Sequence, residues 1–124
     1  MMPAAPRISI VDDDDSLRQS LSNLLRSVGF RVQEFASAEA FLGSPGARET
    51  ACLILDVRMP GMSGLELQRH IQAVNWRLPI IFITSYADDD ARACALGAGA
   101  IGVLHKPFRE QEILDAIDAA LLRE

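Results

Sequence analysis

The chain has 124 residues, the length of one domain that can bury a hydrophobic core without disulfides or structural metal. Hydrophobic residues make up 49% of it, which excludes a disordered chain, and the net charge of −5 argues against direct nucleic-acid binding by this domain. No apolar stretch approaches the roughly 18 residues of a membrane span and no signal peptide precedes the first apolar run, so we expect a cytoplasmic protein. The two cysteines, Cys52 and Cys94, are expected to be buried free thiols.

Five apolar runs rich in β-branched residues predict five strands, and segments with a helical period separate them. The predicted strands are residues 8–11, 31–35, 52–55, 79–84 and 101–104. Alternating strands and helices predict an α/β fold with a doubly wound parallel sheet. The second run is the least cleanly patterned and is expected at a sheet edge, whereas the other four are nearly all apolar, as expected when helices cover both faces.

Capping signals mark the start of three predicted helices. Asp14 or Asp15 could cap the first helix, and Ser63 with Glu66 forms a capping-box pattern at the start of the third. Three aspartates at 88–90 precede the fourth helix, where acidic residues suit the helix dipole.

Polar residues stand at the carboxyl ends of four of the predicted strands. They are Asp12 and Asp13 after the first, Asp56 after the third, Thr84 and Ser85 at the end of the fourth, and Lys106 after the fifth. With the strand order 2-1-3-4-5, the sheet reverses direction between strands one and three, and ligands bind in the crevice at that point. The sequence therefore predicts one small cleft that contains three carboxylates, a hydroxyl group and an ammonium group.

These side chains indicate phosphoryl chemistry. Three carboxylates that face one another require a counter-charge, which Mg²⁺ supplies well because it prefers oxygen ligands; Mn²⁺ is an alternative. A divalent cation, Lys106 and a hydroxyl donor can together hold a phosphoryl group. His105 stands beside Lys106, but its side chain is expected to point the opposite way in a strand, and no serine–histidine pair stands at a strand end, so Asp56 is the best candidate nucleophile.

Four motifs at these strand ends resemble those of the receiver domain of two-component response regulators. They are VDDD at 11–14, D-x-x-M-P-x-M-x-G at 56–64, Thr84-Ser85 and Lys106-Pro107. The resemblance covers residues 1–124 as one receiver domain, apart from an N-terminal tail at 1–6. It implies the flavodoxin-like receiver fold with five parallel strands in the order 2-1-3-4-5.

The resemblance also implies roles for the acidic residues and their neighbour. Asp56 would be the phosphoacceptor, which takes the phosphoryl group from the phosphohistidine of a sensor histidine kinase. Asp13 and Asp56 would ligate Mg²⁺ directly, Asp12 would act mostly through water, and the backbone carbonyl of Arg58 would be a further ligand. The Arg58 side chain is also a candidate for tuning the lifetime of the phosphoryl group.

Further roles fall on the fourth and fifth strands. Thr84 would move to bond a phosphoryl oxygen, Lys106 would pair with that group, and the Lys106–Pro107 peptide would be cis. We expect Tyr86 to shield the phosphoryl group from water, because it is large and stands beside Thr84. The family usually has Tyr or Phe three residues before the lysine, but here Val103 has no ring to swing inward on activation.

The expected function is a phosphorylation-driven switch. Its output face would be the fourth helix, fifth strand and fifth helix, at about residues 88–122, which would meet a second copy or an effector. The VRMP stretch and SAEAFL at 37–42 resemble regulators whose output is a helix-turn-helix DNA-binding domain, outside this chain. A truncated regulator and a stand-alone receiver both remain open.

Three other functions also remain open. A Mg²⁺-dependent phosphatase with an aspartyl nucleophile would use the spacing of Asp12 and Asp14, although the chain has no cap insertion. A pseudo-receiver would bind partners without phosphorylation. A flavodoxin-like cofactor binder would need a phosphate-cradling loop after the first strand, where this chain has acids. We expect a phosphoacceptor with slow self-dephosphorylation and no enzymatic turnover.

Overall fold

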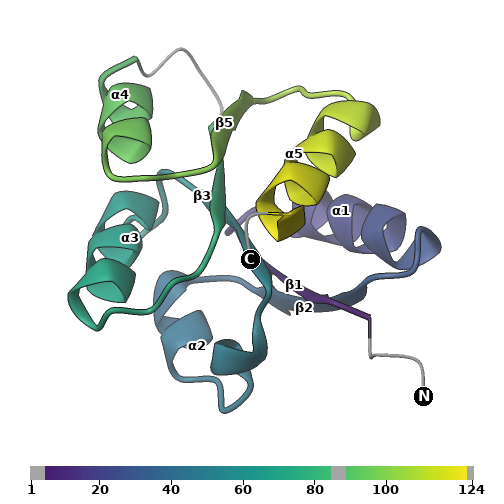
Figure 1. Ribbon diagram of the computed structural model, residues 1–124, viewed down its shortest axis with the longest axis horizontal. Helices are drawn as coiled ribbons and strands as arrows, with labels where there is room; N and C mark the ends of the chain where they lie inside the picture. The colour runs from purple at the N-terminus through teal and green to yellow at the C-terminus, as the bar shows by residue number, and fades with distance from the viewer. Residues whose placement is uncertain (1–4, 85–88, 123–124) are drawn as a thin grey trace.

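The computed structural model describes residues 5–84 and 89–122, which form a doubly wound α/β domain around one parallel sheet (Figure 1). The strands are β1 (Arg7–Val11), β2 (Arg31–Phe35), β3 (Cys52–Asp56), β4 (Ile80–Thr84) and β5 (Gly102–His105). Their order is β2-β1-β3-β4-β5, and every neighbouring pair is parallel. The predicted fold class and strand order are therefore confirmed.

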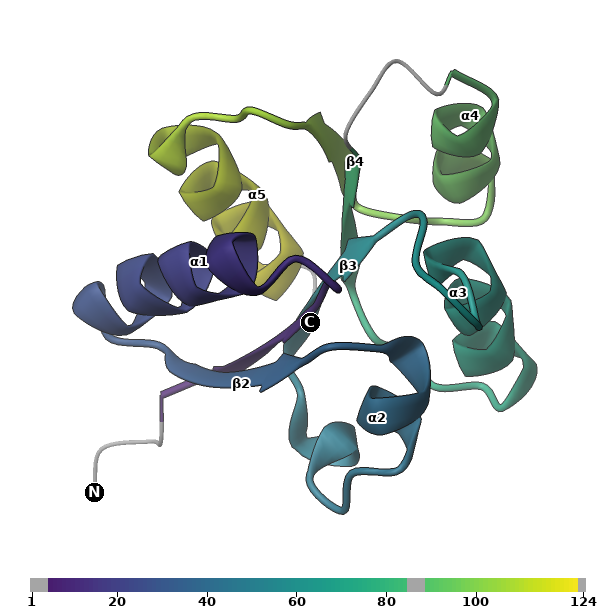
Figure 2. The same cartoon turned by 180° about the vertical axis from the view of Figure 1, so that it is seen from behind.

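Helices cover the sheet on both faces. They are α1 (Asp15–Ser27), α2 (Ala38–Leu42), α3 (Gly64–Ala73), α4 (Asp89–Gly97) and α5 (Glu110–Leu122), with a short 3₁₀ helix at Ala47–Glu49. Helices α1 and α5 lie on one face, and α2, α3 and α4 lie on the other (Figures 1 and 2). Alternate residues of the strands point into two separate cores: Ile10 and Ile54 pack toward α1 and α5, while Leu53 and Leu55 pack toward the other three helices.

The central strands are the buried ones. Every residue of β3 and β4 is buried, whereas β2 lies at one edge with no fully buried residue. The edge position predicted for residues 31–35 is confirmed. Strand β5 is only half-buried throughout, because it is the other edge of the sheet and lacks a strand neighbour on one side.

The helix starts follow the predicted caps. The Asp14 side chain accepts a hydrogen bond from the Leu17 amide at 3.2 Å, so Asp14 is the cap of α1 and the next aspartate is the first helical residue. Ser63 and Glu66 form the predicted capping box at the start of α3.

The expectation for the cysteines was half wrong. Cys52 is buried, but Cys94 is exposed. The inward stripe of α4 is made of Ala91 and Ala95, and Cys94 lies beside that stripe on the outer surface of the helix. Within residues 5–84 and 89–122, no helix is both long and apolar enough to cross a membrane.

Candidate functional site

The carboxyl ends of β1, β3, β4 and β5 bring the predicted polar residues to one edge of the sheet. Asp12 directly follows β1, Asp56 ends β3, Thr84 ends β4 and Lys106 directly follows β5. Asp12 is 0% exposed and Asp56 is 7% exposed. Burial of two carboxylates in one place is costly unless opposite charge is supplied, so this edge differs from an ordinary polar surface.

Lys106 supplies the opposite charge from across the sheet. Its Nζ atom lies 3.1 Å from Asp12 Oδ2 and 3.7 Å from Asp56 Oδ2. The Lys106 amide donates to the Thr84 carbonyl at 2.7 Å, which anchors the lysine backbone to the end of β4. The Lys106–Pro107 peptide is cis, as predicted. One ammonium group therefore faces two buried carboxylates.

A third carboxylate completes an acidic cluster. Oxygen atoms of Asp12, Asp13 and Asp56 all lie within 4.8 Å of one another, and Asp13 is exposed. Burial and then the charge of Asp12 raise the pKa of Asp56 from its ordinary value of 3.8 to about 6, although Lys106 and the Arg58 amide oppose the rise. Three carboxylates with one ammonium group are short of positive charge, and the all-oxygen cluster could hold a metal ion.

The loop after β3 is shaped by glycine and by a carboxylate from α2. A Cβ atom on Gly64 would lie 2.1 Å from the carbonyl oxygen of Asp56, so only glycine allows α3 to start this close to the strand end. The Gly64 amide donates to the Val57 carbonyl at 2.9 Å. Glu39 accepts a hydrogen bond from the Met62 amide at 3.1 Å. Gly64 belongs to the motif at 56–64, but no local sequence pattern predicts the contact of Glu39 with a residue 23 positions away.

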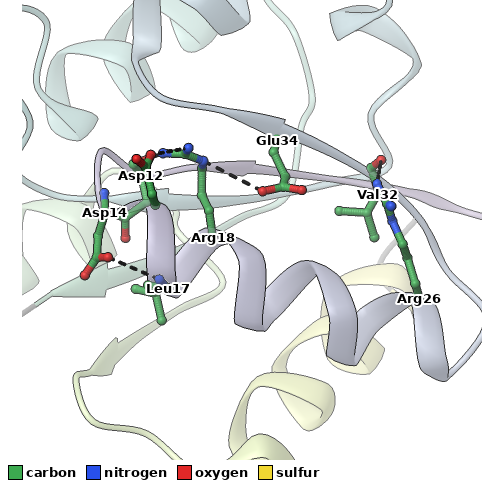
Figure 3. A network of polar contacts seen from close by, with 8 residues as sticks. Asp12, Asp14, Leu17, Arg18, Arg26, Val32 and Glu34 are labelled. Carbon is green, nitrogen blue, oxygen red and sulfur yellow. Dashed lines mark hydrogen bonds and ion pairs between the residues drawn. The ribbon is translucent and has the colours of Figure 1, made fainter.

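The loop after β1 is also held by several hydrogen bonds. The Asp14 amide donates to Asp12 Oδ1 at 2.9 Å, and the Asp12 amide donates to the Phe35 carbonyl at 3.2 Å. Arg18, another residue that the sequence analysis missed, donates to the Asp12 carbonyl at 2.7 Å (Figure 3). An arginine in the first turn after four aspartates was the available signal.

The remaining predicted residues take different positions around the cluster. Thr84 is buried at 5% exposure, and Pro107 is exposed. Arg58 has an exposed side chain, and its amide donates to Asp56 Oδ1 at 3.3 Å. Val103 is half-buried, pairs with Phe82 of β4 in the sheet register and packs against the core beneath α2, α3 and α4. Tyr86, with Ser85, lies outside the described residues.

An acidic cluster with a lysine at the reversal point of a 2-1-3-4-5 sheet defines a receiver-type α/β domain. The chain belongs to the response regulator receiver domain family, whose model matches residues 8–118. Receiver domains of this family bind Mg²⁺ through acidic residues and interact with histidine kinases and output domains.

Three known proteins illustrate the similarity. Nodulation protein W of Bradyrhizobium diazoefficiens (strain USDA 110) is 48% identical over 117 residues, which are 94% of this chain and 52% of that protein. Transcriptional regulatory protein TdiR of Thauera aromatica is 43% identical over 117 residues, again 94% of this chain and 52% of that protein. The solved structure of response regulator StyR has a TM-score of 0.88 and 49% identity, and the match covers 97% of this chain and 61% of that one. The chain thus spans about half the length of the curated relatives it matches.

Proposed function

We propose that the domain is a phosphorylation-driven switch in which Asp56 accepts a phosphoryl group from a histidine kinase. The observation that carries the proposal is the placement of Asp56 in a three-carboxylate cluster, with the Lys106 ammonium 3.7 Å away. In the transfer, a carboxylate oxygen of Asp56 attacks phosphorus, the phosphorus–nitrogen bond of phosphohistidine breaks, and the imidazole leaves with the electron pair. The products are an aspartyl phosphate and a neutral histidine after protonation.

The neighbouring residues have separate tasks in this proposal. Lys106, already at hydrogen-bond distance from Asp12, pairs with the phosphoryl oxygens, and the Thr84 hydroxyl donates to one of them after a small movement. Asp13, Asp56 and the Arg58 carbonyl would hold Mg²⁺ directly, and Asp12 would act through water; Mn²⁺ is the alternative ion. When bound, the ion supplies positive charge to the phosphoryl oxygens. It also favours the ionised, nucleophilic form of Asp56, which burial disfavours.

The output of the switch is a change in surface shape. Phosphorylation shifts a two-state equilibrium of α4, β5 and α5, which then forms a homodimer or contacts an output domain. Val103 lacks the ring of an aromatic switch residue, so we propose that β4 and α4 move without one. We propose that this output domain lies outside residues 1–124 and controls transcription, which is supported by a relative named a transcriptional regulatory protein. We also propose that the protein acts in the cytoplasm. A role for Tyr86 in shielding the phosphoryl group stays a prediction.

The test is intact-mass spectrometry after incubation with acetyl phosphate and Mg²⁺. We expect one added phosphoryl group in the wild type, and none in Asp56→Asn or after addition of EDTA. Asp14→Asn is the matched control, because Asp14 caps α1 and should leave phosphorylation unchanged. Continuous release of phosphate would favour an aspartyl phosphatase. Absence of an adduct after rapid quenching would favour a receiver that binds partners without phosphorylation.

A further inference from the structure

Arg18 is a nearly buried arginine beside the acidic cluster. Its side chain is 14% exposed, and its guanidinium group reaches three oxygens in different elements (Figure 3). Nη1 donates to the Asp12 carbonyl at 2.7 Å, Nη2 pairs with Asp15, and Nε lies 3.8 Å from Glu34 Oε1 on β2. The five donors of a guanidinium group are spread over three nitrogens and reach acceptors that lie apart, whereas the three donors of an ammonium group start from a single nitrogen.

The contact with Asp12 is to the backbone and leaves the carboxylate free for Lys106. The Asp12 carbonyl belongs to the peptide that joins Asp12 to Asp13, and both side chains contribute to the acidic cluster. The Asp13 carboxylate is exposed, so its direction depends on the backbone that carries it. A donor that fixes this peptide therefore fixes the directions in which the side chains of Asp12 and Asp13, two of the three cluster carboxylates, point from the backbone.

We propose that Arg18 is a positioning residue for the cation site: it holds the Asp12–Asp13 peptide so that both carboxylates face Asp56. The proposal rests on the proposed function in one respect, namely that the cluster binds Mg²⁺. The described contacts of Arg18 are with the Asp12 carbonyl, Asp15 and Glu34, so none of them is to a carboxylate of the acidic cluster. Outer contacts of this kind orient metal ligands, and their loss typically weakens metal binding about 10- to 100-fold.

The chain offers a matched control on the same helix. Arg26 donates from Nη2 to the Val32 carbonyl of β2 at 3.3 Å and so also ties α1 to the edge strand (Figure 3). It lies two turns beyond Arg18 and makes no described contact with the loop that carries Asp12. Loss of Arg26 therefore removes a positive charge and an α1–β2 contact without affecting the acidic loop.

The experiment measures Mg²⁺ affinity by calorimetry in unphosphorylated wild type, Arg18→Met, Arg18→Lys and Arg26→Met. We expect binding about tenfold weaker in both Arg18 variants and within twofold of wild type in Arg26→Met. The direction of the change in Mg²⁺ affinity is decisive for Arg18→Met. A simple charge effect would strengthen Mg²⁺ binding in this variant, because a positive charge is removed beside three carboxylates. Faster amide hydrogen exchange at Asp13 and Asp14 in EDTA should accompany the loss in the Arg18 variants alone.

Each other outcome has a defined meaning. Unchanged or tighter Mg²⁺ binding in folded Arg18→Met would overturn the positioning role. If Arg18→Met fails to fold, Arg18→Lys keeps the charge and decides alone: affinity equal to wild type overturns the proposal. A wild type that binds Mg²⁺ but takes no phosphoryl group would sink the proposed function, while weaker binding in the Arg18 variants would still support positioning.

Discussion

Two buried polar residues, one within β1 and one directly after it, show how differently the two ends of the sheet are built. Ser9 and Asp12 are three residues apart and both are 0% exposed. Toward the amino end, the Ser9 hydroxyl pairs with the Thr50 hydroxyl at 2.6 Å, and both groups are neutral and satisfied. At the carboxyl end, burial and then the charge of Asp12 raise the pKa of Asp56. One pair stabilises the fold, whereas the other costs stability and leaves a site for a cation.

The largest expected effect comes from removal of the ammonium group at the carboxyl end. We expect Lys106→Met to lower the free energy of unfolding by about 3 kcal/mol in EDTA at neutral pH, because it leaves two buried carboxylates without the opposite charge that now faces them. Urea unfolding followed by circular dichroism measures the loss. The variant should regain stability as the pH falls, since protonation of Asp56 removes one of the two charges.

The control for this prediction is an ion pair at the amino end. Arg7 pairs with Glu49 at 2.6 Å, but the Glu49 side chain is 67% exposed. Water screens such a pair, so Arg7→Met should cost less than about 1 kcal/mol. Equal losses in the two variants would mean that the acidic cluster is no more sensitive to charge than the surface.

The second prediction is a gain of stability from loss of the proposed phosphoacceptor. Asp56→Asn should raise the free energy of unfolding by about 2 kcal/mol in EDTA at neutral pH. The folded protein binds a proton at Asp56 more tightly than the unfolded chain, so this group contributes stability below pH 3.8, which is lost as the pH rises to about 6. The gain in Asp56→Asn should thus be complete above about pH 6 and vanish below pH 3.8. A gain that is independent of pH would contradict this explanation.

The third prediction is that Mg²⁺ stabilises the fold, because it supplies positive charge that the three carboxylates of the acidic cluster lack. At a Mg²⁺ concentration ten times the dissociation constant, a single site stabilises the wild type by about 1.4 kcal/mol. Thermal unfolding with Mg²⁺ and with EDTA should show this difference, and Asp13→Asn should reduce it strongly because Asp13 is one of the three cluster carboxylates. A matching concentration of Na⁺ is the control for ionic strength. Equal stabilisation by both salts would mean general screening and no specific site.

The same comparison explains what the sequence could predict. Alternating strands and helices place all strand ends at one edge, so Asp12, Asp56 and Lys106 could be brought together without coordinates. Contacts between residues far apart in the sequence could not be predicted from it. Glu39 accepts a hydrogen bond from the Met62 amide only because α2 packs beside the loop after β3. The exposure of Cys94 was mispredicted because an alanine-rich helix gives a weak amphipathic pattern, from which its buried side is hard to read.

The smallest expected effect tests the neutral end of the comparison. Ser9→Ala removes one member of the buried hydroxyl pair and leaves Thr50 Oγ1 without that partner, at an expected cost of about 1 kcal/mol. Thr50→Val should cost a similar amount, and the double variant should be close to the wild type, since replacement of both partners by apolar groups is nearly neutral. Unlike the variants of the acidic cluster, all three should show the same change in unfolding free energy at pH 4.5 and 7.5, with or without Mg²⁺. A loss that depended on pH or metal would mean that the two ends of β1 are coupled. The amino end could then no longer be treated as a passive support for the acidic cluster.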